Sequence, residues 1–450
     1  SHEAATDEDP FFMAKAIVYA RTKGFMRLQP IYGLVVLSGV SPNLFERIFP
    51  LVIRTVADLS DFLMLMKAAG RGQGGRVVKR VCADFLNRLN EYAVLKYNGQ
   101  GRGFSLSDMV RVIHPKPVSA IQSALFAYSR GLVAAEDLPQ ELSQFRAYEA
   151  LKMAKTEGEA VRFIKLGRLP HNIVTGTVKM TSGIWEALLK DMPLFALIRH
   201  LSVLERHGLV EKHREWLQER IADKEAIKRA MILPQRYVEA YRYINTHWLK
   251  DVLRLGVEKS VTSIPDIKGK TAIFLDRSGS MEGKILMTAA TFAFSLYKKT
   301  CGDCLFMLFN TKLYDPKPSL YDSIISQAER IEALGGTDTS VGIRHLLENK
   351  IVVDNIIIIT DEEQNAGSSF NTQLSDYRRK INSDAKVIIV NVSPYANAMN
   401  PPEDELTFYV YGWSDAVVSY VANAANGYCT LIDVIENEVL PDACRSDGSA

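Results

Sequence analysis

Four short, uninterrupted apolar runs in the C-terminal part most strongly limit what this chain can fold into. They span residues 272–275, 305–309, 355–359 and 387–390. Such runs are typical of parallel strands that are buried on both faces of a sheet. The helical stretches expected between them lie near residues 285–299, 321–333 and 370–381. This alternation predicts a doubly wound α/β domain, whose ligand site lies at the carboxyl ends of the strands.

Residues 10–255 carry a different pattern, in which apolar side chains recur at steps of three and four. One stripe is Leu194, Leu197, Ile198, Leu201 and Leu204, and another is Val78, Cys82, Phe85, Leu89 and Tyr92. Each stripe predicts an amphipathic helix. Because such helices cannot bury their stripes alone, we expect stacked helix pairs of the HEAT-like kind. The predicted domains are therefore an all-α domain at 1–264 and an α/β domain at 265–450.

Composition is that of an ordinary globular protein, with 47% hydrophobic and 24% charged residues. No apolar run reaches the roughly 20 residues that a membrane span needs, and the start of the chain is too acidic for a secretory signal. The five cysteines are odd in number, which disfavours a disulfide framework. We expect a cytoplasmic protein without a membrane partner.

Charge is divided unevenly along the chain. Up to Lys268 there are 39 Lys and Arg against 28 Asp and Glu, whereas the remainder has 15 against 24. A basic half suits a polyanion binder, because each neutralised phosphate releases condensed counterions. On composition alone, the alternative remains that solvated helix faces simply vary in charge.

Oxygen-bearing side chains follow two of the predicted strands and precede one predicted helix. Asp276, Ser278 and Ser280 follow the first strand, Asp361 follows the third, and Thr337 lies on a glycine-rich loop between them. Carboxylate and hydroxyl oxygens suit a hard divalent cation, and the three loops meet at one sheet edge. We predict that these five residues hold Mg²⁺, with Mn²⁺ or Ca²⁺ as alternatives. The reading without a metal is that Asp276 caps a helix and Asp361 merely ends a strand.

An enzyme is not expected from these loops. Glu362 or Glu363 could polarise a metal-bound water, but no histidine lies on any of the three loops. No glycine-rich phosphate-binding motif precedes a helix in the right place. The sequence therefore predicts no catalytic residues.

Cationic side chains of the helical half gather in two clusters. The first comprises Arg71, Arg76, Lys79, Arg80 and Arg88. The second comprises Lys96, Arg102, Arg111, His114 and Lys116 around a glycine-rich loop that also carries Phe104. This mixture suits RNA, because cations hold phosphates and rings stack on unpaired bases. The alternative is a solvated loop with Phe104 packed into the core.

Two segments resemble the TROVE domain of the Ro autoantigen family. They are residues 96–117 and residues 184–199, the latter reading Ile-Trp-Glu-Ala-Leu-Leu-Lys-Asp-Met-Pro-Leu-Phe-Ala-Leu-Ile-Arg. Residues 269–436 resemble the von Willebrand factor A family and its metal-ion-dependent adhesion site, and they follow in the order that the Ro family has.

The resemblance implies a monomeric ring of HEAT-like helices closed by the A domain. It implies small noncoding Y RNAs on the outer surface, and 3′ ends of misfolded RNAs in a basic central hole. Such proteins act in RNA quality control as scaffolds, in bacteria with a 3′-to-5′ exoribonuclease, and no DNA specificity is expected.

The resemblance also carries over by position. Lys96 and His114 match RNA-contacting residues of the family, and Arg102 matches a third on a loop with one residue more than the family pattern. Ser278 and Ser280 would bind the metal directly, Thr337 directly or through water, and Asp276 and Asp361 largely through waters.

The rival function is an assembly module in which the metal binds an acidic residue of a protein partner. The basic half favours RNA, because a purely protein-binding module does not need it.

Overall fold

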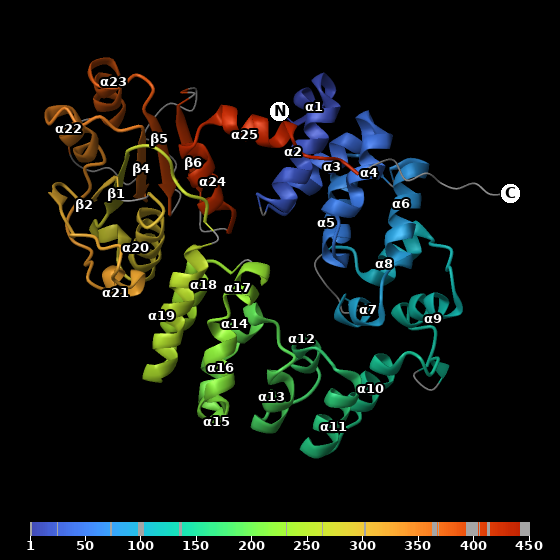
Figure 1. Cartoon of the computed structure of the whole chain (residues 1–450). Helices are drawn as coiled ribbons and strands as arrows, with labels where there is room; N and C mark the ends of the chain where they lie inside the picture. Colours follow the sequence, from blue (N-terminus) through green and yellow to red (C-terminus); the bar gives the residue numbers. More distant parts are fainter. Residues whose placement is uncertain are drawn as a thin grey trace. The chain divides into compact units, whose positions relative to one another are not determined.

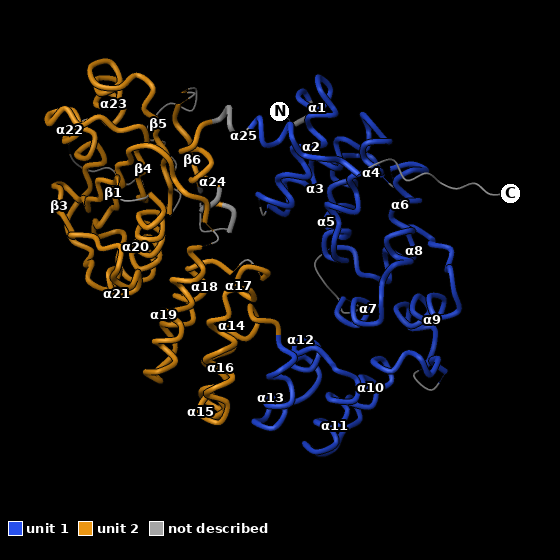
Figure 2. Tube along the Cα trace, in the orientation of Figure 1, with its two compact units in different colours: residues 1–192, 432–450 blue, residues 193–431 orange. Residues whose placement is uncertain are grey.

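The computed structural model describes residues 2–24, 26–72, 74–97, 103–134, 137–230, 232–262, 264–300, 303–361, 367, 369–392, 404, 406–411 and 415–441 (Figure 1). Contacts divide the chain into two compact units (Figure 2). Unit 1 comprises residues 1–192 and 432–450, and unit 2 comprises residues 193–431. In sequence, unit 2 is therefore an insertion into unit 1.

Unit 1 is built from helices joined by turns. They are α1 (His2–Glu8), α2 (Pro10–Thr22), α3 (Leu28–Val40), α4 (Pro42–Val52), α5 (Val56–Ala68), α6 (Gly75–Asn87), α7 (Glu91–Tyr97), α8 (Leu106–Ile113), α9 (Ala120–Ser129), α10 (Ser143–Lys152), α11 (Glu157–Gly167), α12 (His171–Val174), α13 (Ser182–Leu189) and the end of α25 (Tyr428–Glu436). Capping boxes start α5, α8 and α11, which explains where these helices begin. An aromatic cluster of Phe45, Phe49 and Phe62, with ring centroids 5.5–5.9 Å apart, joins α4 to α5.

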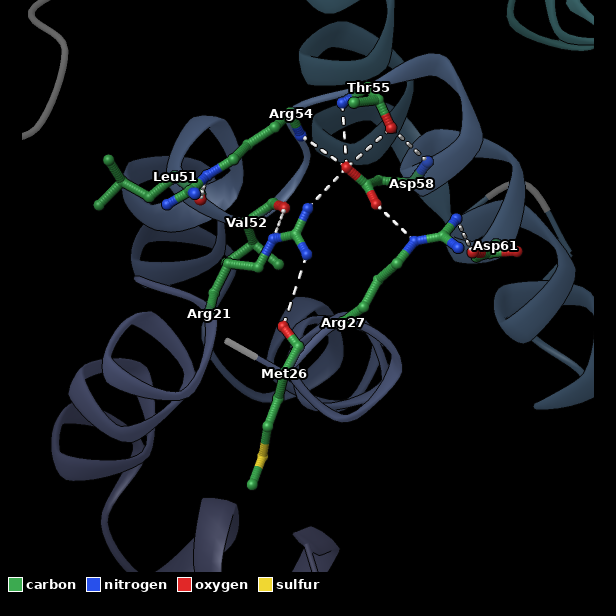
Figure 3. A network of polar contacts seen from close by, with 9 residues as sticks. All are labelled: Arg21, Met26, Arg27, Leu51, Val52, Arg54, Thr55, Asp58 and Asp61. Carbon is green, nitrogen blue, oxygen red and sulfur yellow. Dashed lines mark hydrogen bonds and ion pairs between the residues drawn. The ribbon is translucent and has the colours of Figure 1, made fainter. Parts of the chain in front are cut away.

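A buried carboxylate ties the first helices of unit 1 together (Figure 3). Asp58 in α5 accepts a hydrogen bond of 2.7 Å from Arg21 in α2 and one of 3.0 Å from Arg27, which precedes α3. It also accepts from the backbone N–H and the hydroxyl of Thr55 at 3.0 and 2.9 Å. A buried charge with this many donors fixes the relative placement of three helices, because any displacement leaves the charge unsatisfied.

The C-terminal segment 432–441 also belongs to unit 1 and contacts its first helices. The Lys15 ammonium in α2 donates to the Glu436 carbonyl, and Lys23 forms an ion pair with Glu438. Arg47 in α4 donates to the Pro441 carbonyl at 2.7 Å. We call residues 432–441 the strap.

Unit 2 begins with helices and continues as an α/β sheet domain. Its helices before the sheet are α14 (Leu194–Arg206), α15 (Leu209–Lys212), α16 (Arg214–Ile221), α17 (Lys224–Ala230), α18 (Pro234–Tyr241) and α19 (His247–Val261). The strands are β1 (Thr271–Asp276), β2 (Cys304–Phe309), β3 (Leu313–Tyr314), β4 (Asn355–Thr360), β5 (Lys386–Asn391) and β6 (Thr407–Tyr411). The remaining helices are η2 (Gly279–Met281), α20 (Lys284–Tyr297), α21 (Ile324–Ala328), α22 (Val341–Glu348), α23 (Phe370–Lys380) and α24 (Asp415–Ala425).

The six strands are ordered β3-β2-β1-β4-β5-β6, and only β3 is antiparallel to its neighbour. Alternate residues of the central strands, such as Phe274 and Ile358, pack against α22 and α23 in one apolar core. Helix α20 packs against β1 and β4. Because the strands are covered by helices, their sequences are continuously apolar, and the order places the end of β1 at the centre of the sheet.

A helical N-terminal region followed by an α/β sheet domain is the predicted fold class, and this prediction is confirmed. The prediction of a single helix along the stripe from Val78 to Tyr92 is wrong, because α6 ends at Asn87 and α7 begins at Glu91. The helix expected at 321–333 is also wrong in length, because α21 covers only Ile324–Ala328. Within the described residues, no helix is long and apolar enough to cross a membrane.

Candidate metal edge and nucleic-acid surface

Hydrogen bonds bring the predicted metal-binding loops together at the carboxyl ends of β1, β2 and β4. The Gly279 N–H donates to the Gly335 carbonyl at 2.9 Å, which joins the loop after β1 to the loop that carries Thr337. The side chain of Asn310, directly after β2, donates to the Leu334 carbonyl at 2.7 Å. Gly335 has φ +84°, a left-handed conformation that glycine adopts without strain. The sheet edge predicted from the sequence is thus present as one connected surface.

Asp276 lies at the centre of this edge and is fully buried. One of its carboxylate oxygens accepts from the Ser278 N–H at 2.8 Å and the other from the Thr360 hydroxyl at 2.6 Å. Burial raises the pKa of Asp276 from 3.8 to about 6, the hydrogen bonds from Thr360 and Ser278 lower it in part, and the Asp361 carboxylate raises it further. Two buried carboxylates close enough to repel each other form a site that a cation would stabilise.

The five predicted ligands differ in their access to solvent. Asp276, Ser278, Thr337 and Asp361 are buried, whereas Ser280 is exposed and its hydroxyl lies 3.2 Å from that of Ser278. The donors are all oxygens, which fits a hard cation such as Mg²⁺. Among the described residues, no group of three or more His, Cys, Asp or Glu side chains could hold a metal, so a nitrogen- or sulfur-rich site is not seen there. Glu362 and Glu363, considered above as bases, lie outside the described residues.

Sequence reasoning missed the roles of Asp338 and Asn310, whose hydrogen bonds shape this edge. Asp338, next to Thr337, accepts from the Ser340 N–H and hydroxyl at 3.0 and 2.6 Å, and it pairs with Arg344 in α22 at 2.7 Å. The Asp338 N–H in turn donates to the Asn310 carbonyl at 2.9 Å. Asp338 therefore positions the Thr337 loop. Arg277 is half-buried, and its guanidinium lies 5.0 Å from the ring centroid of Tyr314.

The first cationic cluster lies on α6 and directly beside it. Arg76, Lys79 and Arg80 are exposed side chains of α6, and Arg80 forms a 2.7 Å ion pair with Glu46 in α4. Arg71, just before this helix, is instead half-buried and donates to the Val35 carbonyl at 2.7 Å. Arg71 thus stabilises the packing against α3 through this hydrogen bond, whereas the charged groups of Arg76 and Lys79 are exposed to solvent.

The second cluster spans the end of α7 and the end of α8. Lys96 is exposed, and its ammonium lies 5.7 and 5.3 Å from the ring centroids of Tyr92 and Tyr97. His114 is exposed and ends α8 in a left-handed conformation with φ 51°, directly before Pro115. Arg102, the third predicted contact, lies outside the described residues. A cation fixed over two rings can still reach a phosphate, because the interaction leaves its N–H donors available.

Arg111 lines a groove beside the glycine-rich loop. The groove has a volume of about 680 Å³, and its lining includes Lys67 of α5, Phe104 before α8, and Asp108 and Arg111 of α8. Phe104 is half-buried, and its carbonyl accepts from the Ser60 hydroxyl at 3.0 Å. The backbone of Phe104 is therefore anchored, while its side chain borders the groove and is not fully packed in the core.

Two family models match the chain: the TROVE domain over residues 177–262, and the Ro60 von Willebrand factor A domain over residues 270–425. The chain carries a TROVE domain followed by a Ro60-type von Willebrand factor A domain. It is 24% identical over 434 residues to the RNA-binding protein RO60 of Deinococcus radiodurans, covering 88% of this chain and 80% of that protein. It is 25% identical over 326 residues to the RNA-binding protein RO60 of Caenorhabditis elegans, covering 67% of this chain and 50% of that protein.

The fold is shared with a Ro protein of known structure. The crystal structure of Deinococcus radiodurans RO (RSR) protein matches with a TM-score of 0.78 at 20% identity, covering 95% of this chain and 93% of that chain. All five predicted metal ligands fall inside the span of the Ro60 A domain, whereas Lys96 and His114 lie N-terminal to the matched TROVE span. The family assignment therefore rests on the half of the chain that carries the metal edge and on the helices directly before it.

Proposed function

We propose that this Ro-family protein binds RNA through a cationic surface of unit 1, formed by Arg76, Lys79, Lys96, Arg111 and His114. The observation that carries the proposal is the groove beside the glycine-rich loop, which combines two cations with a half-buried aromatic ring. RNA needs this combination, because phosphates take cations and unpaired bases take flat apolar faces. The names of the two relatives, both RNA-binding proteins, support the same reading.

The RNAs proposed are those of the family resemblance. A structured small noncoding RNA of the Y RNA kind would use the surface around Lys96 and His114, and 3′ ends of misfolded RNAs would be the second class. In this reading the cytoplasmic protein is a scaffold in RNA quality control that a 3′-to-5′ exoribonuclease can join. It is not itself a nuclease, because no base or nucleophile accompanies the metal edge in the sequence.

The metal edge supports a second candidate function. The oxygen donors of Asp276, Ser278, Ser280, Thr337 and Asp361 would hold Mg²⁺, which keeps part of its water shell readily. Because Ser280 is exposed, an acidic group from outside could complete the coordination. The helices would then present RNA, and the metal edge would recruit a protein partner through a carboxylate.

The RNA proposal is tested with Lys96→Ala and His114→Ala, singly and together. Titration of a structured small RNA at several salt concentrations should show weaker binding by each variant. Loss of a phosphate contact at Lys96 should also reduce the log–log salt slope by about 0.7 to 0.9. Lys165→Ala, which removes an exposed lysine from the last turn of α11, is the matched control and should bind like the wild type. Wild-type affinity in a folded double variant would refute this surface as the RNA site.

A further inference from the structure

An exposed leucine and an exposed tyrosine lie beside the metal edge of unit 2. Leu334 is 64% exposed and Tyr314 is 38% exposed. Both contact Arg277, the residue directly after Asp276. The Leu334 N–H donates to the Arg277 carbonyl at 2.7 Å, and the Tyr314 ring centroid lies 5.0 Å from the Arg277 guanidinium. We call Arg277, Tyr314 and Leu334 the flank of the metal edge.

Hydrogen bonds hold the backbone of the flank in place. The Arg277 N–H donates at 2.8 Å to the carbonyl of Phe309, the last residue of β2. The Leu334 carbonyl accepts from the Asn310 side chain at 2.7 Å, and the next residue, Gly335, is hydrogen-bonded to the loop that follows β1. The exposed Leu334 side chain is therefore carried by a fixed loop. A ligand can bind to such a surface without first ordering it.

Arg277 is the cation of the flank. Its Nε is buried and has no hydrogen-bond partner among the described residues. The contact with Tyr314 orients the guanidinium but supplies no oxygen acceptor. Arginine stays charged at every physiological pH, and its planar set of N–H donors matches the two oxygens of a carboxylate. A carboxylate from outside would therefore give Arg277 the acceptor that it lacks.

Leu334 and Tyr314 give the flank an apolar component. A single exposed apolar side chain is common on protein surfaces, but these two adjoin the same arginine beside the metal edge. Both would gain from contact with an apolar side chain, which a phosphate backbone does not offer. The chain after Lys268 also carries 15 Lys and Arg against 24 Asp and Glu, a balance that repels a long polyanion. The flank therefore suits a short protein segment better than a nucleic acid.

We propose that the flank determines which acidic protein segment the metal edge binds. One carboxylate of the segment completes the coordination of the metal, as in the second candidate function, on which this inference rests. A second carboxylate binds Arg277, and an apolar side chain beside it packs on Leu334 and Tyr314. A metal with an open position takes any accessible carboxylate, so the flank supplies the discrimination between partners.

Four fluorescein-labelled peptides test the inference on the full chain with Mg²⁺, in anisotropy titrations. Each has glycines at both ends and an amidated C-terminus, and the central residues are Glu-Leu-Glu, Glu-Ser-Glu, Glu-Leu-Gln or Gln-Leu-Gln. The Glu-Leu-Glu peptide should bind most tightly. Loss of the leucine or of one carboxylate should each weaken binding on the order of tenfold, because one contact of either kind is worth about that factor. The Gln-Leu-Gln peptide should not bind.

Variants of the flank should act on one feature of the peptide each. Arg277→Ala should weaken the Glu-Leu-Glu peptide on the order of tenfold and leave the Glu-Leu-Gln peptide unchanged, because the second carboxylate is then missing on one side already. Leu334→Ser should weaken the Glu-Leu-Glu peptide and leave the Glu-Ser-Glu peptide unchanged. A general structural defect would instead weaken all peptides equally. Leu334→Ser should also keep wild-type melting and Mg²⁺ binding, because this side chain is largely exposed.

Matched controls lie at the opposite edge of the sheet. Arg379 is in the last turn of α23, just before β5, and Val352, which is 53% exposed, precedes β4. Both are therefore near the amino ends of strands, whereas the metal edge is at the carboxyl ends. Arg379→Ala and Val352→Ser should bind all four peptides like the wild type.

The outcomes separate this inference from the second candidate function. If Asp276→Ala abolishes binding of the Glu-Leu-Glu peptide but Arg277→Ala and Leu334→Ser retain wild-type affinity, the flank has no role and the inference is overturned, while the second candidate function stands. If no peptide binds in Mg²⁺, the second candidate function fails and the inference fails with it. If labelled pentauridylate competes with the peptide and binds more weakly to Arg277→Ala, the flank takes phosphate and the inference is wrong.

Discussion

Replacing Asp58 by alanine should destabilise unit 1 far more than replacing its neighbour Asp61. Both carboxylates are on α5 and both contact Arg27. They differ in burial: the Asp58 side chain is 1% exposed, whereas that of Asp61 is 25% exposed. The comparison therefore shows what burial, together with the additional hydrogen bonds of Asp58, contributes to a charge pair.

The expected magnitude follows from the groups that lose their acceptor. Without Asp58, the Arg21 guanidinium, with its side chain 12% exposed, has lost its carboxylate partner. Removing one partner from a buried pair costs about 3 to 5 kcal/mol. The capping box of α5 is lost as well, which adds about 1 kcal/mol. Asp61→Ala should cost at most about 1 kcal/mol, as exposed ion pairs do.

Native-state hydrogen exchange with mass spectrometry is the assay, because a chain with two units need not unfold in one step. Amides of α2 and α5 should lose protection by about a thousandfold to ten-thousandfold in Asp58→Ala, since each 1.4 kcal/mol corresponds to about tenfold, and by less than tenfold in Asp61→Ala. Adding Arg21→Met to Asp58→Ala should recover part of the loss, because it removes the uncompensated charge. Equal losses in the two single variants, or no recovery in the double variant, would refute the reasoning.

Three further outcomes are expected. Because burial raises the pKa of Asp276 to about 6, metal-free unit 2 should lose stability as the pH rises from about 4 through 6. Calorimetric titration should accordingly show Mg²⁺ binding more tightly at pH 7.5 than at pH 5.5, and Asp276→Ala should abolish it. Burial raises the pKa of the Cys82 thiol to about 12, so peptide mass spectrometry should find it unmodified by iodoacetamide at pH 8 until urea is added. The purified protein should not cleave labelled RNA with or without Mg²⁺, and cleavage that vanishes in Asp361→Ala would contradict this.

Periodic apolar patterns predicted most of the main helices and strands. They did not predict the break between α6 and α7 or the short strand β3. The stripe along Leu194–Leu204 forms α14, because every residue in it faces the core. The stripe from Val78 to Tyr92 wrongly predicted one helix, because its apolar spacing continues across the break between α6 and α7. Strand β3 has only two residues at the antiparallel edge, too few to leave a pattern.

Some parts of the candidate sites could likewise be predicted from the sequence, and other parts could not. The meeting of Asp276, Thr337 and Asp361 at one sheet edge could be predicted, since these residues end or follow a strand or precede a helix, and sheet topology brings such positions together. That they hold a metal stays a prediction. The roles of Asn310 and Asp338 could not, because they depend on hydrogen bonds between loops that are distant in sequence.

The strap gives the chain a distinctive response to mechanical load. It contacts α2 and α4 across sequence separations of 394 to 421 residues, so both ends of the described chain belong to unit 1. A pulling force applied between residues 2 and 441 would pass through the strap and the first helices, while unit 2 lies outside the path of tension. Unit 2 would be stretched only after the strap had detached. In a single-molecule experiment with both ends tethered, detachment of the strap is therefore the first rupture.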